Sequence, residues 1–184
     1  MKITLVLVTS INGKLTQGLS SDVSSWTSYE DKKHFISEIE KNVLIIMGRK
    51  TYEAARKKMN VVPGKLRMVM TNHPEHYSHE FIPGQLEFTK ESAEVLVHRL
   101  EEMEYTEALL VGGSRVASQF FREKLITDLY LTLEPKLFGK GTLFFNEIDK
   151  TIQLKLENVK QLNTQGTLLL LYNVIYTFLP SPLA

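Results

Sequence analysis

The sequence predicts an α/β protein with a mostly parallel mixed sheet that ends in an antiparallel pair of strands. Short apolar runs alternate with helical patterns as far as about residue 125, which is typical of parallel strands joined by helices. Beyond that point only strand patterns follow, and the last two are joined by the polar segment 163–166. Because no repeat, low-complexity tract or linker interrupts this order, we expect residues 1–184 to form a single domain.

The first half of the chain is predicted to alternate buried strands with helices. In order, it holds a strand at 2–9, a loop at 10–25, a helix at 28–42, a strand at 43–47, a helix at 49–58 and a strand at 66–70. The strands are short runs of β-branched and other aliphatic residues, which is typical of strands buried on both faces. The loop is rich in Ser, Gly and Asn, and its length inside a compact domain indicates a functional role.

The first helix carries its own start signal. Ser28 can cap its first turn, and Asp31 stands three residues later in the capping-box position, as a shorter substitute for Glu. We expect Phe35, Ile36 and Ile39 on one face of this helix.

The second half of the chain moves from alternation to strands alone. In order, it holds a short strand at 85–88, a helix at 91–103, a strand at 108–111, a helix at 114–124 and strands at 128–134, 151–161 and 167–178. Gly112 and Gly113 separate the strand at 108–111 from the helix that follows it.

Composition excludes several classes of function. Lys and Arg number 22 against 21 Asp and Glu, so the net charge of +1 gives no reason to expect nucleic acid or a membrane surface as partner. The absence of cysteine excludes disulfides, thiolate zinc sites and cysteine nucleophiles. The apolar stretch 168–179 is broken by Asn173 and Thr177, whereas a membrane helix needs about 20 predominantly apolar residues. Because the apolar start of the chain has no cleavage site, we expect a cytoplasmic protein.

Three of the predicted strands end in segments that suit phosphate groups. Gly48 to Thr51 brings a glycine, two cations and a hydroxyl to a helix start, where free N–H groups and Arg49 can hold phosphate oxygens. Gly112-Gly113 lets the backbone approach a pyrophosphate at a second helix start, and Thr71-Asn72 adds short polar side chains at a third strand end. Each segment alone is more often a tight turn or a solvated helix start. Together, at the carboxyl edge of one sheet, they indicate an elongated ligand with several phosphates, such as NADPH.

These segments resemble those of dihydrofolate reductases. Residues 47–53 closely resemble that family's Met-Gly-Arg-x-Thr-(Trp/Tyr)-Glu segment, residues 112–120 its glycine-rich cofactor turn and helix, and residues 129–132 its late strand. The spacing of the family's substrate-facing Trp, Asp and Phe is matched by Trp26, Asp31 and Phe35. The resemblance implies a three-layer α/β/α dihydrofolate-reductase-like fold.

The same resemblance implies NADPH as cofactor. It places residues 112–116 against the pyrophosphate, and the ends of the second and third strands beside the adenosine 2′-phosphate. The cofactor-binding residues that it implies are Gly48, Arg49, Lys50, Thr51, Thr71, Asn72, Gly112, Gly113, Ser114, Arg115 and Val116.

A second family competes for the substrate. Residues 10–14 resemble the Ser-x-Asp-Gly-Lys of the reductase domain of riboflavin-pathway deaminase–reductases, and residues 125–145 resemble the ending of that domain even better. That domain shares the dihydrofolate reductase fold, reduces a phosphoribosylaminopyrimidine with NADPH and commonly dimerises through late strands. The resemblance therefore implies a small-molecule substrate and a homodimer, although core packing explains the apolar face of residues 168–176 equally well.

The sequence departs from both families. The riboflavin-type reductases usually carry Glu where this chain has Val111, and Asp where it has Asn12. The Pro-Gly-Arg that grips a glutamate-tail carboxylate in dihydrofolate reductases ends here in Lys65, a point charge that cannot form the bidentate fork.

Asp31 is the predicted catalytic acid. A carboxyl group in a partly apolar pocket can bind an aminopyrimidine edge, and burial raises its pKa, which helps it or an associated water to deliver a proton. The other interpretation is that Asp31 only caps its helix, and the two are compatible. The residues predicted to bind substrate are Trp26, Phe35, Asn12, Lys65 and Thr132.

The remaining polar residues are predicted to be structural or solvated. His73, His76 and His79 recur every three residues, but Pro74 argues against a regular helix there, so we expect an exposed loop and no metal site. His34 is expected at the surface.

The leading hypothesis is an NADPH-dependent reductase acting on a riboflavin-type aminopyrimidine. Dihydrofolate or another pterin is the alternative substrate. A non-catalytic NADP-binding protein is the second alternative, motivated by Val111 and Asn12.

Overall fold

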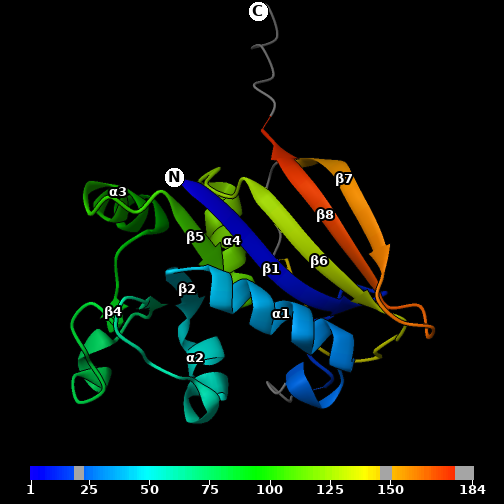
Figure 1. Cartoon of the computed structure of the whole chain (residues 1–184), viewed down its shortest axis with the longest axis horizontal. Helices are drawn as coiled ribbons and strands as arrows, with labels where there is room; N and C mark the ends of the chain where they lie inside the picture. Colours follow the sequence, from blue (N-terminus) through cyan, green and yellow to red (C-terminus); the bar gives the residue numbers. More distant parts are fainter. Residues whose placement is uncertain (19–22, 146–150, 177–184) are drawn as a thin grey trace, which may run out of the picture.

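The computed structural model describes residues 1–18, 23–145 and 151–176, and within them it contains one eight-stranded sheet (Figure 1). The strand order is β4-β3-β2-β5-β1-β6-β8-β7. The strands are β1 (Lys2–Ser10), β2 (Leu44–Gly48), β3 (Leu66–Met70), β4 (Leu86–Thr89), β5 (Glu107–Leu110), β6 (Asp128–Glu134), β7 (Gln153–Gln161) and β8 (Leu168–Ile175).

The first six strands are parallel and the last two are antiparallel. β8 pairs antiparallel with β6, and β7 pairs antiparallel with β8 at the edge of the sheet. The predicted mixed sheet with a C-terminal antiparallel pair is therefore confirmed. Since β1 to β6 all point the same way, their carboxyl ends form one edge, and the candidate site lies along it.

Helices cover both faces of the sheet, which gives the predicted three layers (Figure 1). α1 (Tyr29–Lys41) and α2 (Arg49–Ala55) pack on one face, and α3 (Ala93–Glu102) and α4 (Ser114–Arg122) on the other. Three short 3₁₀ turns complete the helical elements of the described chain, namely η1 (Val23–Ser25), η2 (Arg56–Lys58) and η3 (Pro74–Tyr77). In the described segments, no helix is long and apolar enough to span a membrane.

The strand sequences explain why both faces are covered. Side chains alternate along a strand, so Leu44 and Ile46 enter the core beneath α3 and α4, while Ile45 and Met47 enter the core beneath α1 and α2. All five residues of β2 are buried, as the continuous apolar run predicts for a central parallel strand.

Two expectations about helices differ from the structure. The predicted helix at 49–58 is α2 followed by the 3₁₀ turn η2. The face of α1 that packs on the sheet is also only partly the apolar one, since Ile39 packs on the core but Phe35 and Ile36 do not. Phe35 is 36% exposed and Ile36 is 54% exposed, whereas Asp31 and Glu38 are buried. The other predicted elements agree to within two or three residues, although the predicted loop at 10–25 and strand at 167–178 each extend outside the described residues.

Candidate active site

The N-terminus of α1 is fixed by two hydrogen bonds. The Ser28 hydroxyl accepts the Asp31 N–H at 3.2 Å, which confirms the predicted cap. The Ser28 N–H donates to Oε1 of Glu134 at 2.6 Å, so the carboxyl end of β6 holds the start of the helix. Asp31 is thereby directed at the edge of the sheet.

Asp31 lies in a buried polar pocket. Its residue is 6% exposed, and the hydroxyls of Thr132 and Thr27 hydrogen-bond to its carboxylate. The pKa of Asp31 is raised to about 6, chiefly because burial disfavours the charged carboxylate. The hydrogen bond from Thr132 opposes this rise, and the negative charge of Glu134 adds to it. Only half of the predicted capping box forms, because the Ser28 N–H is taken by Glu134 and not by Asp31. The Asp31 carboxyl group is therefore able to hold a proton near neutral pH.

Glu134 is a functional candidate that the sequence analysis missed. It is 2% exposed, and its second oxygen, Oε2, accepts a hydrogen bond from the Thr167 hydroxyl at 3.0 Å. It therefore joins β6, the start of α1 and the segment just before β8. The sequence did contain a signal for Glu134. Thr132 and Glu134 are two residues apart in one strand, so their side chains must lie on the same face of the sheet.

Trp26 directly precedes Thr27, whose hydroxyl bonds to Asp31. It is buried, and its ring packs edge-on against Phe138, with the ring centroids 5.0 Å apart. Its Nε1 donor is buried and has no hydrogen-bond partner among the described residues, so it can donate to a ligand or water. Phe35 lies one turn after Asp31 on α1 and exposes part of its ring. The substrate-binding roles of Trp26 and Phe35 stay predictions that this arrangement accommodates.

The ends of β2 and β5 meet through glycines. The Gly48 N–H donates to the Gly112 carbonyl at 3.3 Å, and a Cβ on Gly48 would lie only 2.9 Å from Cγ2 of Val116. Gly112 and Gly113 have φ values of 87° and 61°, which favour glycine. A Cβ on Gly113 would lie 3.4 Å from the Thr51 hydroxyl. Two helix starts are thus brought side by side.

These helix starts suit a phosphate-bearing ligand. α4 begins directly after Gly113, and its first N–H groups have no partner within the helix. Ser114 is half-buried and Arg115 is exposed there, while the side chain of Val116 packs into the core. Any contact between Val116 and a cofactor therefore uses its backbone.

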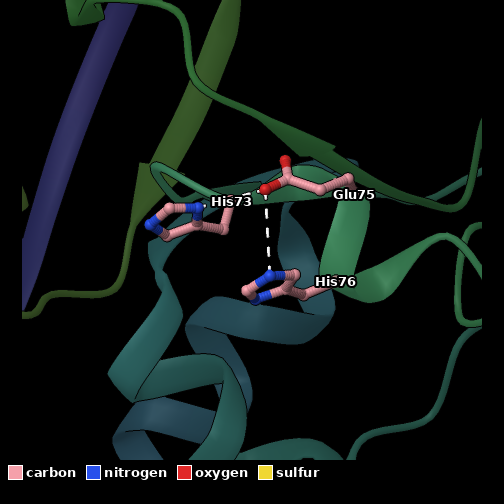
Figure 2. A group of neighbouring side chains, drawn as sticks. All are labelled: His73, Glu75 and His76. Atoms are coloured by element: carbon pink, nitrogen blue, oxygen red, sulfur yellow. Dashed lines mark hydrogen bonds and ion pairs between the residues drawn. The ribbon is translucent and has the colours of Figure 1, made fainter.

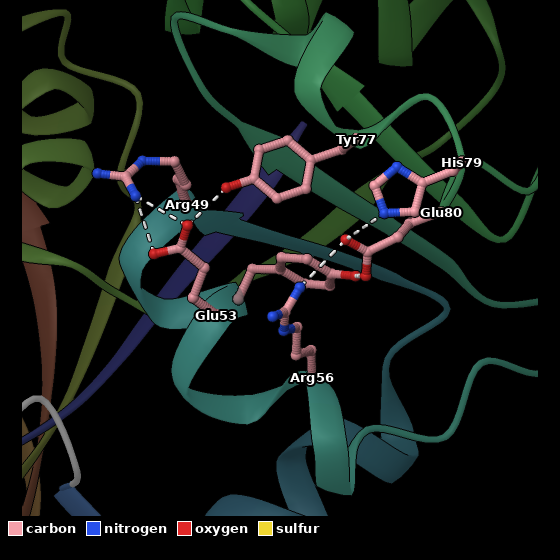
Figure 3. Close-up of polar contacts among 7 residues, drawn as sticks. Arg49, Glu53, Arg56, Tyr77, His79 and Glu80 are labelled. Atoms are coloured by element: carbon pink, nitrogen blue, oxygen red, sulfur yellow. Dashed lines mark hydrogen bonds and ion pairs between the residues drawn. The ribbon is translucent and has the colours of Figure 1, made fainter.

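The cations of α2 are less free than the sequence suggests (Figure 3). Nη1 of Arg49 donates to both carboxylate oxygens of Glu53, each at 2.8 Å, and the Tyr77 hydroxyl donates to the same carboxylate at 2.6 Å. A phosphate must compete with Glu53 or use the remaining N–H groups of the guanidinium. Lys50 is exposed beside it.

A second contact ties Glu80, which follows η3, to α2 and η2. The Tyr52 hydroxyl of α2 donates to Glu80 at 2.5 Å, and Nη1 of Arg56 in η2 donates to the same carboxylate at 3.2 Å (Figure 3). Together with the bond from Tyr77 to Glu53, these contacts hold the segment around η3 against α2 and η2.

Thr71 and Asn72 lie beside Gly48. Met70, the last residue of β3, pairs with Gly48, so the two residues after it share the same edge of the sheet. Thr71 is buried, and its hydroxyl accepts the His73 N–H at 3.2 Å, while Asn72 is exposed. All the predicted cofactor-binding segments thus converge, although the contacts themselves stay predictions.

Two predicted substrate residues have hydrogen-bond partners of their own, and their roles in substrate binding stay predictions. The amide of Asn12 donates to the Phe138 carbonyl at 2.8 Å and accepts the Phe138 N–H at 3.1 Å, so it clamps two loops together. Lys65 donates to the Glu40 carbonyl at 2.5 Å, near the far end of α1. At about 1.5 Å per residue, that carbonyl is roughly 13 Å along the helix from Asp31. Neither contact brings these residues to Asp31.

Two further polar residues were not expected in the interior. Arg67 of β3 is 5% exposed, burial lowers its pKa, and Nη1 has no hydrogen-bond partner among the residues that the structure describes. His34 was predicted at the surface, but it is half-buried with its ring 6.3 Å from that of Tyr130, and burial lowers its pKa. An arginine inside an apolar strand was the available signal for Arg67.

Comparison with known proteins identifies the family. The model of the RibD C-terminal domain matches residues 1–168. The chain belongs to the RibD C-terminal domain family. The relationship to the riboflavin-type reductase domain, expected from the motifs, is therefore confirmed. The expected dihydrofolate-reductase-like fold is shared with the structure of a dihydrofolate reductase from Enterococcus faecalis, which superposes with a TM-score of 0.62 at 19% identity, covering 94% of this chain and 96% of that one.

Individual relatives of this RibD C-terminal domain share modest identity with it. The uncharacterized protein YwjB of Bacillus subtilis is 29% identical over 119 residues, which span 64% of this chain and 66% of that protein. A dihydrofolate reductase of Aedes albopictus is 27% identical over 163 residues, 83% of each chain. The crystal structure of a pyrimidine reductase-like protein from Corynebacterium diphtheriae superposes with a TM-score of 0.77 at 17% identity, covering 96% of this chain and 92% of that one, which shows a shared fold.

Proposed function

We propose that this RibD C-terminal domain is an NADPH-dependent reductase that transfers a hydride to a small aminopyrimidine of the riboflavin-biosynthesis type, such as 5-amino-6-(5-phosphoribosylamino)uracil. The observation that carries the proposal is a buried carboxyl group with a raised pKa, Asp31, on the sheet edge where glycines bring two helix starts together. β5, β1 and β6 are neighbours, so the glycine-lined end of β5 is two strands away from Thr132.

The glycine-lined edge fits a dinucleotide. A Cβ at Gly48 would strike α4, and the positive φ values of Gly112 and Gly113 hold the backbone open at the start of that helix. In the proposal the N–H groups of α4 and the hydroxyl of Thr51 hold the phosphates, and Arg49 and Lys50 favour a phosphorylated ribose. NADPH, when bound, supplies the hydride.

Asp31 supplies the proton in this proposal. Thr132 and Thr27 orient its carboxyl group, and burial keeps a share of it protonated near neutral pH. Asp31 gives its proton to the nitrogen of the substrate's C=N bond, whose carbon accepts the hydride. The π bond is thereby replaced by one N–H and one C–H bond, and Asp31 is left as a carboxylate that solvent reprotonates. Trp26 and Phe138 shield the pocket from water on one side.

Arg67 supports a substrate with an anionic extension. Its side chain lies on the α1 and α2 face of β3, because it alternates with Leu66 and Met68 of the opposite core. A buried guanidinium without a full set of partners is costly unless an anion reaches it. A phosphate or carboxylate that extends from Asp31 alongside α1 would meet this guanidinium and Lys65.

Dihydrofolate is the second candidate substrate. The pairing of Asp31 with a strand threonine, beside Trp26, suits a pterin edge as well as a uracil edge. The dihydrofolate reductase of Aedes albopictus, at 27% identity, favours it independently.

A steady-state assay separates these substrates. Loss of NADPH absorbance is measured with the phosphoribosylaminopyrimidine, with dihydrofolate and with neither. Turnover of the first alone supports the proposal, turnover of dihydrofolate alone replaces it with the second candidate, and NADPH binding without turnover of either indicates a non-catalytic NADP-binding protein. Asp31→Asn should reduce turnover much more than NADPH affinity, and equal losses in both would contradict its role as acid.

A further inference from the structure

The turn that follows β3 carries a cluster of metal-ligating side chains separate from Asp31. His73, Glu75 and His76 each offer one ligand atom, and these three atoms lie within 4.8 Å of one another (Figure 2). Nδ1 of His73 is 3.0 Å from Oε1 of Glu75, and Nε2 of His76 is 3.9 Å from the same oxygen. All three side chains are exposed, so an ion can reach them from solvent.

The backbone beneath this cluster is fixed. The His73 N–H donates to the Thr71 hydroxyl at 3.2 Å, and the His76 N–H donates to the His73 carbonyl at 3.2 Å. Tyr77 is buried and stacks on Phe88, with ring centroids 4.8 Å apart and planes 7° from parallel. The ligand-bearing turn is therefore anchored to the sheet on both sides, and only side-chain rotations are needed to adjust the ligands.

Pro74 does not prevent this arrangement, contrary to the sequence-based expectation. It occupies the start of the 3₁₀ turn η3, where a missing N–H and a fixed φ are tolerated. His73 is the N-cap of η3 and His76 lies within the turn, and their stacked rings show that both project from the same side. Their rings lie 5.0 Å apart and 11° from parallel.

We propose that His73, Glu75 and His76 bind a divalent transition-metal ion, with Zn²⁺ as the best match. Two imidazole nitrogens and one carboxylate oxygen are a frequent zinc donor set, and a water completes the tetrahedron. With bonds of about 2.0–2.2 Å, two ligands of a tetrahedral ion lie about 3.3 Å apart. The His73–Glu75 separation is already close to this value, and His76 needs to approach Glu75 by less than about 1 Å.

Glu75 is the carboxylate that faces both imidazoles, with Oε1 at 3.0 Å from His73 and 3.9 Å from His76. Glu80 is nearby in sequence but is engaged by Tyr52 and Arg56, which leaves Glu75 as the carboxylate of this turn that is turned toward the imidazoles.

Calorimetric titration of the full chain with Zn²⁺, after removal of any polyhistidine tag, tests the site. We expect saturable binding of one ion per chain, weakened on the order of tenfold or more in His73→Ala and in His76→Ala. The matched control is His98→Ala, since His98 is an exposed histidine beside Glu102 at 3.4 Å but has no second imidazole. His98→Ala should bind Zn²⁺ as the unaltered chain does.

Two results would overturn the proposal. One is the absence of saturable one-to-one binding, and the other is equal affinity in His73→Ala and His98→Ala. Substitution with Co²⁺ adds a readout of geometry, because a tetrahedral site gives strong visible absorption bands that should vanish in His76→Ala. These measurements use neither NADPH nor substrate, so they test the metal site independently of the proposed reductase activity. Circular dichroism checks that each variant is folded.

Discussion

Asp31→Asn should stabilise the protein at alkaline pH while removing its acid. The pKa of Asp31 is raised from 3.8 to about 6 in the folded state. The folded protein therefore binds this proton more tightly than the unfolded chain does. The contribution of Asp31 to the free energy of unfolding is fully present below its pKa in the unfolded chain, 3.8, and is lost as the pH rises through its pKa in the folded protein, about 6. Asparagine has the same shape as aspartic acid but does not ionise, so it does not lose this stability as the pH rises.

The size of the effect follows from the two pKa values. A difference of about two units corresponds to about 3 kcal/mol, at 1.36 kcal/mol per unit. We therefore expect Asp31→Asn to gain up to about 3 kcal/mol in free energy of unfolding at about pH 8, relative to its effect at about pH 4. Comparing the two pH values cancels any pH-independent change in the hydrogen bonds to Thr132 and Thr27.

Urea denaturation of both proteins at the two pH values measures this difference. Glu38→Gln is the matched control, because Glu38 is a buried carboxylate on the same helix that pairs with Lys41 at 2.7 Å. Glu38→Gln therefore measures the effect of losing a helix carboxylate while Asp31 is unchanged. If the advantage of Asp31→Asn stayed constant or shrank between about pH 4 and pH 8, burial would not be the main influence on this carboxyl group.

Three other substitutions test neighbouring parts of the site. Glu134→Gln can still accept from the Ser28 N–H, while its NH2 group would donate to the Thr167 hydroxyl instead of accepting from it. Because the substitution removes a negative charge, the pKa of Asp31, followed by carbon-13 NMR, should fall, and an unchanged value would contradict the coupling. Gly48→Ala should lose about 1–3 kcal/mol of stability from overpacking and should also weaken NADPH binding, measured by calorimetry. The control is Gly139→Ala, because a Cβ added at Gly139 has no atom within 4 Å, and it should change neither stability nor NADPH binding. Arg67→Met should leave the thermal stability unchanged or raised, because it removes a buried guanidinium. It should raise KM for an anionic substrate far more than it lowers kcat. A large loss of stability would show that the charge of Arg67 is already compensated.

Most of the architecture could be predicted from the sequence because its signals are local. β3 and β6 have the predicted bounds, since short stretches rich in aliphatic residues between polar segments define strands without tertiary information. Ser28 caps α1 as predicted, because the cap depends on residues three apart. The convergence of Gly48 with Gly112 also followed, since parallel strands bring their carboxyl ends to one edge.

The remaining features depend on contacts distant in sequence. Asn12 was assigned to substrate by resemblance, but its partner is the backbone of Phe138, 126 residues away. The engagement of Arg49 by Glu53 is a local i,i+4 pair that could have been predicted, whereas the hydrogen bond from Tyr77 to the same carboxylate could not. Glu134 was overlooked because nothing local shows that two distant carboxylates meet.

The predicted apolar face of α1 differs from the face that is buried, for a reason that bears on function. Apolar residues normally turn inward, yet Ile36 is exposed while Asp31, His34 and Glu38, spaced three and four residues apart, face inward. A helix that only completed a core would gain free energy by the opposite rotation. The polar stripe is held in place instead by the bond from Ser28 to Glu134 and by the threonine hydroxyls on Asp31. Such a conflict between local preference and observed burial is expected where a site is built at the expense of stability. For this reason we expect Asp31→Asn to stabilise the protein at alkaline pH.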